Sequence, residues 1–286
     1  MQPQYNLELL RNALYARCKA LWGAGLIAKF LVFALGTFVV FVPVNPTLVA
    51  LLGLLLAVAS EFLQWLSDRR KSAAHQLHRK LDFENSFGWK ITDREMKDFL
   101  ARYAGDIESL CGPSKGTFFA SDKQPGPMRA LENLRESAWW SMHLSETMGW
   151  VFLTAILLVV FGCIFLLNVS VQDFSQATTP GVLQGASNTS LSAPAVSASV
   201  VKVVTSGVLF VFWYGLFRFA TGYFSFAGKS RQIVDQAEGL LEHAPTDEVQ
   251  AIKLWQDYHL ARDAAPLIPK WIWKFREKKL NKIWTS

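Results

Sequence analysis

The sequence predicts an all-α, polytopic membrane protein, with four transmembrane helices in two hairpins and a helical cytoplasmic region formed by extensions of the membrane helices. Three observations favour this fold class. Hydrophobic residues make up 51% of the 286 residues and charged residues only 18%. Four apolar stretches are each long enough to cross a bilayer, and the basic residues gather outside these stretches. The chain carries neither a strand pattern nor an internal repeat.

The apolar stretches divide the chain into five parts. A bilayer core about 30 Å thick requires about 20 apolar residues at 1.5 Å each, and the stretches that satisfy this are 26–44, 47–66, 148–169 and 203–223. Only a Val44-Asn45-Pro46 turn separates the first two spans, which therefore form a tight hairpin. The predicted parts are an N-terminal cytoplasmic helix (1–25), a transmembrane hairpin (26–66), a cytoplasmic helical segment (67–147), a second hairpin (148–223) with a flexible outer loop (172–199), and C-terminal cytoplasmic helices (224–286).

The basic residues predict the orientation of the spans. Of the 29 Lys and Arg residues, 3 precede the first span, 13 lie in 67–147 and 10 follow the fourth span. The hairpin turn and the Ser/Thr-rich outer loop contain none. Because loops rich in Lys and Arg stay in the cytoplasm, we expect both termini and the middle segment to be cytoplasmic.

The segment that follows the second span continues as a helix. Leu66, Ala73, Leu77 and Leu81 keep helical spacing, which predicts a helix as far as Phe83, and Gly88 then breaks the pattern. Thr92 to Glu95 matches a capping box, in which side chains satisfy the first backbone amides of a helix. The helix that follows is amphipathic, with a predicted buried stripe at Met96, Phe99, Leu100 and Tyr103.

Two further helical patterns lead into and out of the second hairpin. Pro127 suits a first helical position, and the predicted stripe behind it runs unbroken into the third span through Leu131, Leu134, Ala138 and Met142. After the fourth span the helical pattern continues to Pro245 through Ile233, Ala237, Leu240 and Leu241.

The C-terminal region predicts two shorter helices. Thr246, with two acidic residues after it, is expected to open a helix whose apolar stripe is Val249, Ile252 and Trp255. A break at 265–269 contains two prolines. The tail at 271–284 is helical by propensity, and it either lies on the membrane surface or docks against neighbouring helices.

Three ionisable residues fall within the apolar stretches. Lys29, Glu61 and Arg218 all lie in the cytoplasmic half of the predicted bilayer. Charges there are costly, by about 2.5 to 3.5 kcal/mol at the bilayer centre, so one interpretation is a charged cluster that joins helices or lines a water-filled path. The other is that Lys29 and Arg218 extend to the headgroups and that Glu61 lies near the interface.

Signatures of catalysis and of metal binding are absent from the sequence. There is no Gly-x-x-x-x-Gly-Lys loop, Gly-x-Ser-x-Gly elbow or His-Glu-x-x-His helix, so we expect neither enzymatic activity nor a cofactor. His75 and His78 are three residues apart on one helix, but no accompanying ligand makes them a zinc site, and we expect them on a solvated face. Cys18, Cys111 and Cys163 are too few and too scattered for a disulfide framework.

Basic residues alternate with aromatic ones in the cytoplasmic segments. Arginine pairs well with phosphate, and flat rings stack on nucleotide bases. This mixture favours a nucleotide-binding surface, for which the candidate residues are Arg69, Arg79, Lys80, Trp89, Arg94 and Arg262. The alternative is that cytoplasmic orientation alone explains the basic residues and that the aromatic residues form a core.

Two segments carry a resemblance to a known family. The first is His75-Gln-Leu-His-Arg-Lys-Leu-Asp-Phe-Glu-Asn-Ser-Phe-Gly-Trp-Lys-Ile-Thr-Asp-Arg-Glu95, and the second is Arg262-Asp-Ala-Ala-Pro-Leu-Ile-Pro-Lys-Trp271. Together with the two membrane hairpins they resemble the SMODS-associated four-transmembrane effectors of bacterial cyclic-oligonucleotide anti-phage signalling (CBASS). The resemblance covers nearly the whole chain, and the long Ser/Thr/Ala-rich outer loop departs from the compact unit of that family.

The resemblance implies an effector of the bacterial inner membrane. A nucleotidyltransferase encoded nearby, with which no stable complex is implied, would make a cyclic oligonucleotide. This ligand would bind the cytoplasmic part, and the spans would then disrupt the membrane. Because four helices enclose little lumen, we expect a homo-oligomer that acts on membrane lipids. The alternatives are a constitutive ion channel or small-solute transporter, and a non-conducting membrane anchor or assembly protein.

Overall fold

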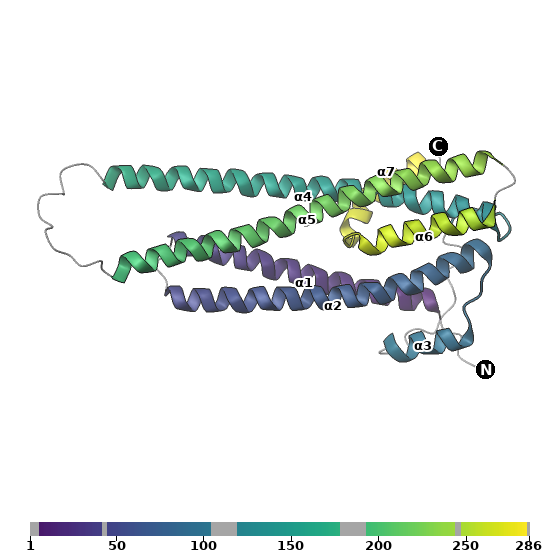
Figure 1. Ribbon diagram of the computed structural model, residues 1–286, viewed down its shortest axis with the longest axis horizontal. Helices are drawn as coiled ribbons and strands as arrows, with labels where there is room; N and C mark the ends of the chain where they lie inside the picture. The colour runs from purple at the N-terminus through teal and green to yellow at the C-terminus, as the bar shows by residue number, and fades with distance from the viewer. Residues whose placement is uncertain (1–5, 42–44, 104–118, 178–192, 244–246, 285–286) are drawn as a thin grey trace, which may run out of the picture. The chain divides into compact units, whose positions relative to one another are not determined.

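The chain is built from helices, as the sequence predicts. The computed structural model describes residues 6–41, 45–103, 119–177, 193–243 and 247–284, and these form seven helices and no strand (Figure 1). The helices are α1 (Leu7–Phe41), α2 (Pro46–Phe87), α3 (Asp93–Tyr103), α4 (Pro127–Ala177), α5 (Ala193–Glu242), α6 (Glu248–Ala264) and α7 (Lys270–Trp284).

Three helices are long and apolar enough to cross a membrane. Within the described residues, the segments that qualify are Leu7–Gly36, Thr47–Phe87 and Pro127–Gly162, in α1, α2 and α4. Their apolar side chains are exposed, for example 63% for Ile27, 62% for Leu54 and 69% for Leu158. Exposed apolar surface of this extent is typical of contact with lipid. Most side chains of the predicted fourth span, 203–223, lie outside the described residues.

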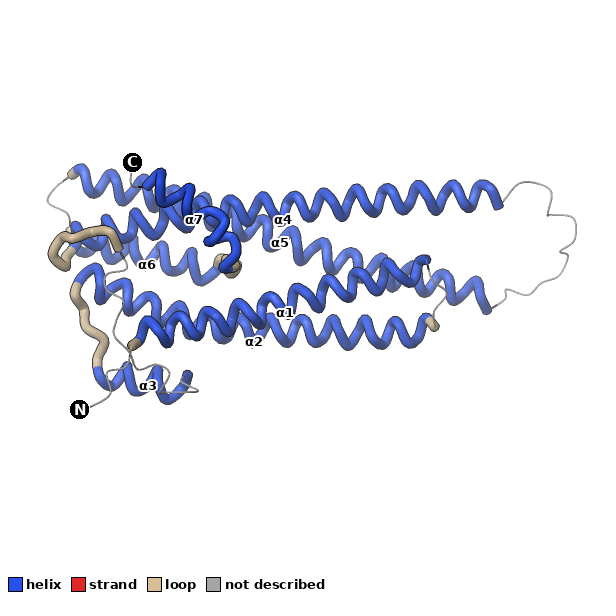
Figure 2. The backbone as a smooth tube through the Cα atoms, turned by 180° about the vertical axis from the view of Figure 1, so that it is seen from behind, coloured by secondary structure: helices blue, strands red, loops and turns tan. Residues whose placement is uncertain are grey.

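The chain divides into two compact units. Unit 1 consists of residues 1–25, 61–149 and 221–286, and unit 2 consists of residues 26–60 and 150–220. The borders of unit 2 fall close to the predicted membrane spans, and the N-terminal, middle and C-terminal segments predicted to be cytoplasmic supply unit 1. Each of the helices α1, α2, α4 and α5 is unbroken along its length (Figure 2), so each supplies residues to both units.

One core of unit 1 joins α4, α5 and α6. Its buried members include the predicted stripe of α4, with Leu131, Leu134 and Ala138 all 0% exposed. Ile233 and Ala237 of α5 and Trp255 of α6 are also fully buried in this core. The helical spacing of these residues therefore predicted which faces pack together, and the indole N–H of Trp255 donates to the Ala130 carbonyl at 2.8 Å.

The second core of unit 1 joins α1, α2 and α3. Leu10 and Leu14 pack with Leu77 and Leu81, and Phe99 of α3 closes the cluster. The predicted capping box is confirmed, because the Glu95 amide donates to Thr92 Oγ1 and the Thr92 amide donates to Glu95 Oε2, both at 3.3 Å. Lys80 of α2 forms an ion pair with Glu95, which fixes α3 on this face.

Helix α2 ends at Phe87, four residues beyond the predicted end at Phe83, and Gly88 follows it as the predicted break. Its φ of 76° lies in the left-handed region that favours glycine, and its amide donates to the Glu84 carbonyl at 3.0 Å. A glycine in this position closes the helix and turns the chain towards α3.

The structure corrects the predicted start of α6. Thr246 lies outside the described residues, and Asp247 is the N-cap, with its side chain accepting from the Val249 amide at 3.0 Å. Val249, predicted to be buried, is 70% exposed. The buried face is instead Ala251, Leu254, Trp255, Tyr258 and His259. At 3.6 residues per turn, Val249 lies on the opposite side of the helix from Ala251 and Tyr258.

Both ends of the predicted outer loop, 172–199, differ from the prediction. Helix α4 continues to Ala177 and helix α5 begins at Ala193, so residues expected in a loop are helical. Residues 178–192 lie outside the described part of the chain. The alanines at both ends have high helix propensity, which extends the helices beyond the apolar stretches.

A close approach between α5 and the 265–269 linker gives a first prediction. A Cβ at Gly222 would lie 3.0 Å from Pro266 Cγ, so Gly222→Val should destabilise unit 1 by about 1–3 kcal/mol through overpacking. At Gly228, in the same helix, a Cβ would have nothing within 4 Å, so Gly228→Val is the matched control. Thermal unfolding of the purified variants measures both, and equal stability of the two variants would contradict the prediction.

Candidate functional site

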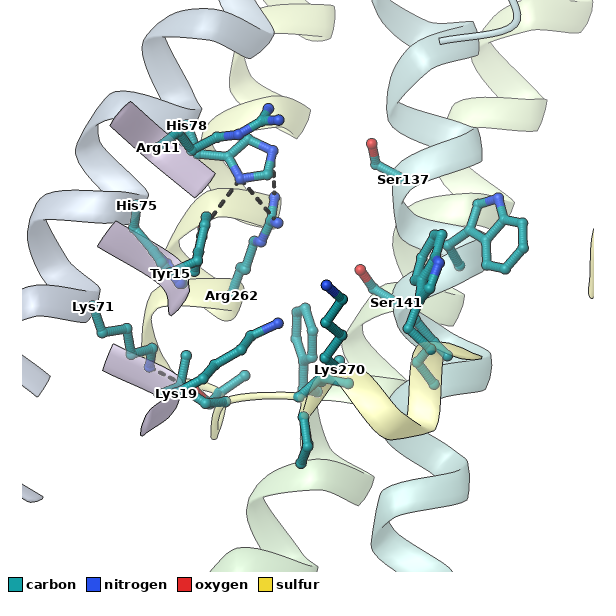
Figure 3. A pocket seen from close by; sticks show the side chains of 18 of the residues that line it. Arg11, Tyr15, Lys19, Lys71, His75, His78, Ser137, Ser141, Arg262 and Lys270 are labelled. Carbon is teal, nitrogen blue, oxygen red and sulfur yellow. Dashed lines mark hydrogen bonds between the residues drawn. The ribbon is translucent and has the colours of Figure 1, made fainter. Parts of the chain in front are cut away.

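Unit 1 contains a cavity of about 720 Å³ (Figure 3). Helices α1, α2, α4, α5, α6 and α7 and the 265–269 linker all contribute to its wall. Among the described residues, its charged and histidine side chains are Arg11, Lys19, Lys71, His75, His78, Glu136, Arg262 and Lys270. The wall is therefore strongly cationic, and Glu136 is its one carboxylate.

Helical spacing places the cationic side chains on one side of the cavity. Arg11, Tyr15 and Lys19 are four residues apart on α1, and this spacing puts them on a single face. Helix α2 presents Lys71, His75 and His78 in the same way, as Figure 3 shows. Helices α1 and α2 therefore form a cationic wall together.

Arg262 of α6 lies at the centre of a buried polar network. Its Nη2 donates to His78 Nδ1 at 3.1 Å, and its Nη1 lies 3.9 Å from Asp82 Oδ2. Asp82 is 2% exposed, and burial raises the pKa of its carboxyl, although the positive charge of Arg262 opposes this shift. The network holds the guanidinium in position, and the Arg262 side chain stays 24% exposed towards the cavity.

The two histidines on α2 are buried, which corrects the expectation of a solvated face. His75 is 7% exposed and His78 is 8% exposed. Burial lowers the pKa of His75 to about 4, although a hydrogen bond to Asp263 opposes the shift. Burial also lowers the pKa of His78 well below its usual value. Both rings are therefore uncharged at neutral pH, and His78 can accept the hydrogen bond from Arg262.

The 265–269 linker is fixed to the helices around it. Lys71 Nζ donates to the carbonyls of Asp263 and Ala265 at 2.7 and 2.6 Å, and the Tyr223 hydroxyl donates to the Leu267 carbonyl. Because Lys71 is engaged in this way, it holds the wall of the cavity together. The linker in turn positions Lys270 at the start of α7.

Aromatic rings and hydroxyls line the rest of the cavity. The rings are Tyr15, Phe119, Trp140, Phe226, Tyr258, Trp273 and Trp284. Trp140 of α4 stacks on Trp273 of α7 with ring centroids 4.8 Å apart, and the Ser141 and Tyr258 hydroxyls lie 2.7 Å apart. Cations facing flat rings and hydroxyls suit a ligand that combines phosphate with a planar base.

Of the ligand-binding residues predicted from the sequence, Arg262 lines this cavity. The other five are not among its lining residues. The Arg69 guanidinium lies 5.7 Å from the centroid of the Trp65 ring, Lys80 pairs with Glu95, and Trp89 stacks on Phe87 at 5.2 Å. Arg79 and Arg94 are exposed.

Sequence reasoning missed most of the cavity. Arg11, Lys19 and Tyr15 precede the first span and were not considered as ligand contacts. Their i, i+4, i+8 spacing places two cations and a phenol on one helical face, and this signal could have found them. Lys270 carries no such signal, because its position depends on the linker.

None of the predicted intramembrane charges is among the described residues that line the cavity. Lys29 is partly exposed, and Glu61 and Arg218 are exposed. Lys29 and Arg218 belong to unit 2, whereas Glu61 is in unit 1. The charged cluster remains a prediction.

Searches with protein-family models and against curated proteins and solved structures find no match for this chain. Within the described residues, no group of three or more His, Cys, Asp or Glu side chains is placed to hold a metal ion. The fold and the cavity define the class to which the protein belongs. In its described residues it is an all-helical protein, with three helices able to cross a membrane and a cationic, aromatic-lined cavity in unit 1.

Proposed function

We propose that the protein is a membrane-disrupting or pore-forming effector of bacterial anti-phage defence. A cyclic oligonucleotide binds the cavity of unit 1 on the cytoplasmic side of the inner membrane, and the spans then damage the membrane and arrest or kill the cell. The protein acts as a homo-oligomer with four spans. It responds to a nucleotidyltransferase only through this diffusing ligand.

The observation that carries the proposal is the composition of the cavity wall. All four long helices contribute to it, and three of them contain the segments able to cross a membrane. A ligand that pulls the cationic residues together moves helices that continue into lipid. It shifts the conformational equilibrium only by its difference in affinity between the two states, so the geometry of the cavity must differ between the resting and the open protein.

Leakage from liposomes tests the proposal. The full chain is reconstituted into vesicles loaded with a fluorescent dye, and cyclic di- and trinucleotides are added. The effector function requires dye release that depends on one of these compounds. Release without nucleotide would indicate a constitutive channel, and the absence of release under all conditions would indicate a membrane anchor.

Substitution of Arg262 should weaken activation. Arg262→Gln removes a charged hydrogen-bond donor from the cavity wall, and the concentration of cyclic nucleotide needed for half-maximal release should rise about 10- to 100-fold. Dose–response curves in the liposome assay measure this shift.

Arg79→Gln and Arg94→Gln are the matched controls for Arg262→Gln. Both arginines are exposed and neither lines the cavity, so both variants should respond as the parent protein does. A response lost in these variants and kept in Arg262→Gln would instead place the ligand on the basic residues at the end of α2 and in α3.

A further inference from the structure

Two lysine side chains extend into the cavity with no acceptor of their own. Lys19 of α1 and Lys270 of α7 both line it, and Figure 3 shows their side chains directed into the open space. Within the part of the chain that the structure describes, neither ammonium group has a hydrogen-bond acceptor or a carboxylate within reach. Lys19 lies over the Tyr15 ring, with Nζ 5.9 Å from its centroid.

The two ammonium groups repel each other. Burial lowers the pKa of Lys19, and the positive charges of Arg262 and Lys270 lower it further. Lys19 is partly buried, whereas Lys270 is exposed, and a partly buried cation that lacks a counter-ion is costly. An anion between Lys19 and Lys270 would remove this cost and join α1 to α7.

Arg262 supplies a second cationic centre. Its guanidinium has five N–H donors in a fixed plane. Nη1 and Nη2 both lie within hydrogen-bond distance of the His78 ring, at 3.4 and 3.1 Å, so His78 engages at most two of the five donors. The plane suits a phosphate oxygen pair. Of the other cations in the wall, Lys71 donates to two backbone carbonyls and Arg11 donates to Asn12.

The opposite wall provides the surfaces that a nucleoside needs. Ser137 and Ser141 of α4 face the cavity (Figure 3), and their hydroxyls can bind a sugar. Trp140 and Trp273 offer rings on which a base can stack. The volume of about 720 Å³ lies within the range of small-ligand sites, about 300–1,000 Å³.

On the basis of the function proposed above, we infer that the ligand is a cyclic dinucleotide. One of its phosphodiesters binds between Lys19 and Lys270, and the other binds Arg262. Each phosphodiester carries one negative charge, so a dinucleotide matches these two centres. A larger ring brings a third phosphodiester, for which the described residues of the wall offer only Arg11 and Lys71, whose side chains already donate to Asn12 and to two backbone carbonyls.

Equilibrium binding to the full chain in lipid nanodiscs tests the inference. The probes are cyclic dinucleotides and cyclic trinucleotides that cover adenine, guanine and uracil, together with the mononucleotides. We expect a cyclic dinucleotide to bind at least tenfold more tightly than every trinucleotide and mononucleotide. Tightest binding of a trinucleotide that also triggers dye release would overturn the inference and leave the proposed function standing. Absence of binding and of release with all probes would overturn both.

Variants of the two lysines test where the phosphate binds. Lys19→Gln and Lys270→Gln should each weaken binding of the preferred dinucleotide about 10- to 100-fold. Lys274→Gln, on the exposed face of α7, is the matched control and should bind normally. Lys19→Arg keeps the charge and should retain most of the affinity, so a folding defect at this position is distinguishable from loss of the contact. Unchanged binding in both glutamine variants would refute the assignment.

Discussion

Acidification from pH 7.5 to pH 5.0 should destabilise unit 1 by several kcal/mol. His75, His78 and His259 are all buried, and burial lowers the pKa of His75 to about 4 and that of His259 to about 3. An unfolded histidine has a pKa of about 6.5. Below this pH the unfolded chain binds protons that the folded unit cannot accept, so the free energy of unfolding falls as the pH falls.

The size of this effect follows from the number of protons. Each histidine contributes about 1.4 kcal/mol per pH unit, or about 2 kcal/mol between pH 6.5 and pH 5.0, and three together contribute up to about 6 kcal/mol. Asp263, whose pKa is lowered by its hydrogen bond to His75 despite burial, adds to the loss only below this range of pH, where an unfolded aspartate begins to bind protons. Asp82 opposes it, because a carboxyl whose pKa is raised by burial favours the folded unit at low pH.

Thermal unfolding at pH 7.5, 6.0 and 5.0, followed by tryptophan fluorescence, measures the acid effect. His259→Gln should lose about one third of the dependence on pH. His243→Gln, at an exposed position, should keep all of it. A melting temperature that is the same at pH 7.5 and pH 5.0 would show that the three rings are accessible to protons in the folded protein.

Periodicity predicted the helices of unit 1 well because burial is set by spacing along each helix. Leu131, Leu134 and Ala138 are fully buried where the pattern placed them, and the capping box at Thr92 forms the predicted bonds. The prediction for Val249 was wrong because the buried face of α6 is centred on Ala251, Trp255 and Tyr258, and Val249 lies on the other side of the helix. Which face of a short helix is buried depends on the neighbouring helices, and a local pattern of three apolar residues does not contain this information.

Most residues of the cavity wall could not be predicted from the sequence, for a different reason. Its wall combines single residues from helices far apart in the chain, such as Lys19 and Lys270. Basic residues are dense in the segment after the second predicted span, yet several of those side chains serve the fold, as Lys80 does with Glu95. Arg262 was predicted as a ligand-binding residue because it lies in a basic and aromatic segment. Its contact with Asp82 could be recognised only in the tertiary structure.

Removal of the Trp255 side chain should produce the largest loss of stability from a single substitution. Trp255 is 0% exposed and stacks on His259, with ring centroids 5.1 Å apart. Its indole N–H donates to the Ala130 carbonyl of α4 at 2.8 Å. Trp255→Ala therefore removes the packing and the hydrogen bond that hold α6 on α4, at a cost of about 3–5 kcal/mol. Chemical denaturation of the purified protein measures this loss.

The same substitution links the fold to the cavity. Tyr258 and Arg262 follow Trp255 on α6 and both line the cavity, so loosening α6 should also weaken nucleotide binding.

Trp271→Ala is the matched control for Trp255→Ala, because this indole is 55% exposed and its loss should change stability by less than about 0.5 kcal/mol. Trp255→Phe keeps most of the packing and loses the hydrogen bond, so its stability should lie between those of the parent and the alanine variant. Equal stability of Trp255→Ala and Trp271→Ala would mean that α6 is held by the linker and not by its buried face.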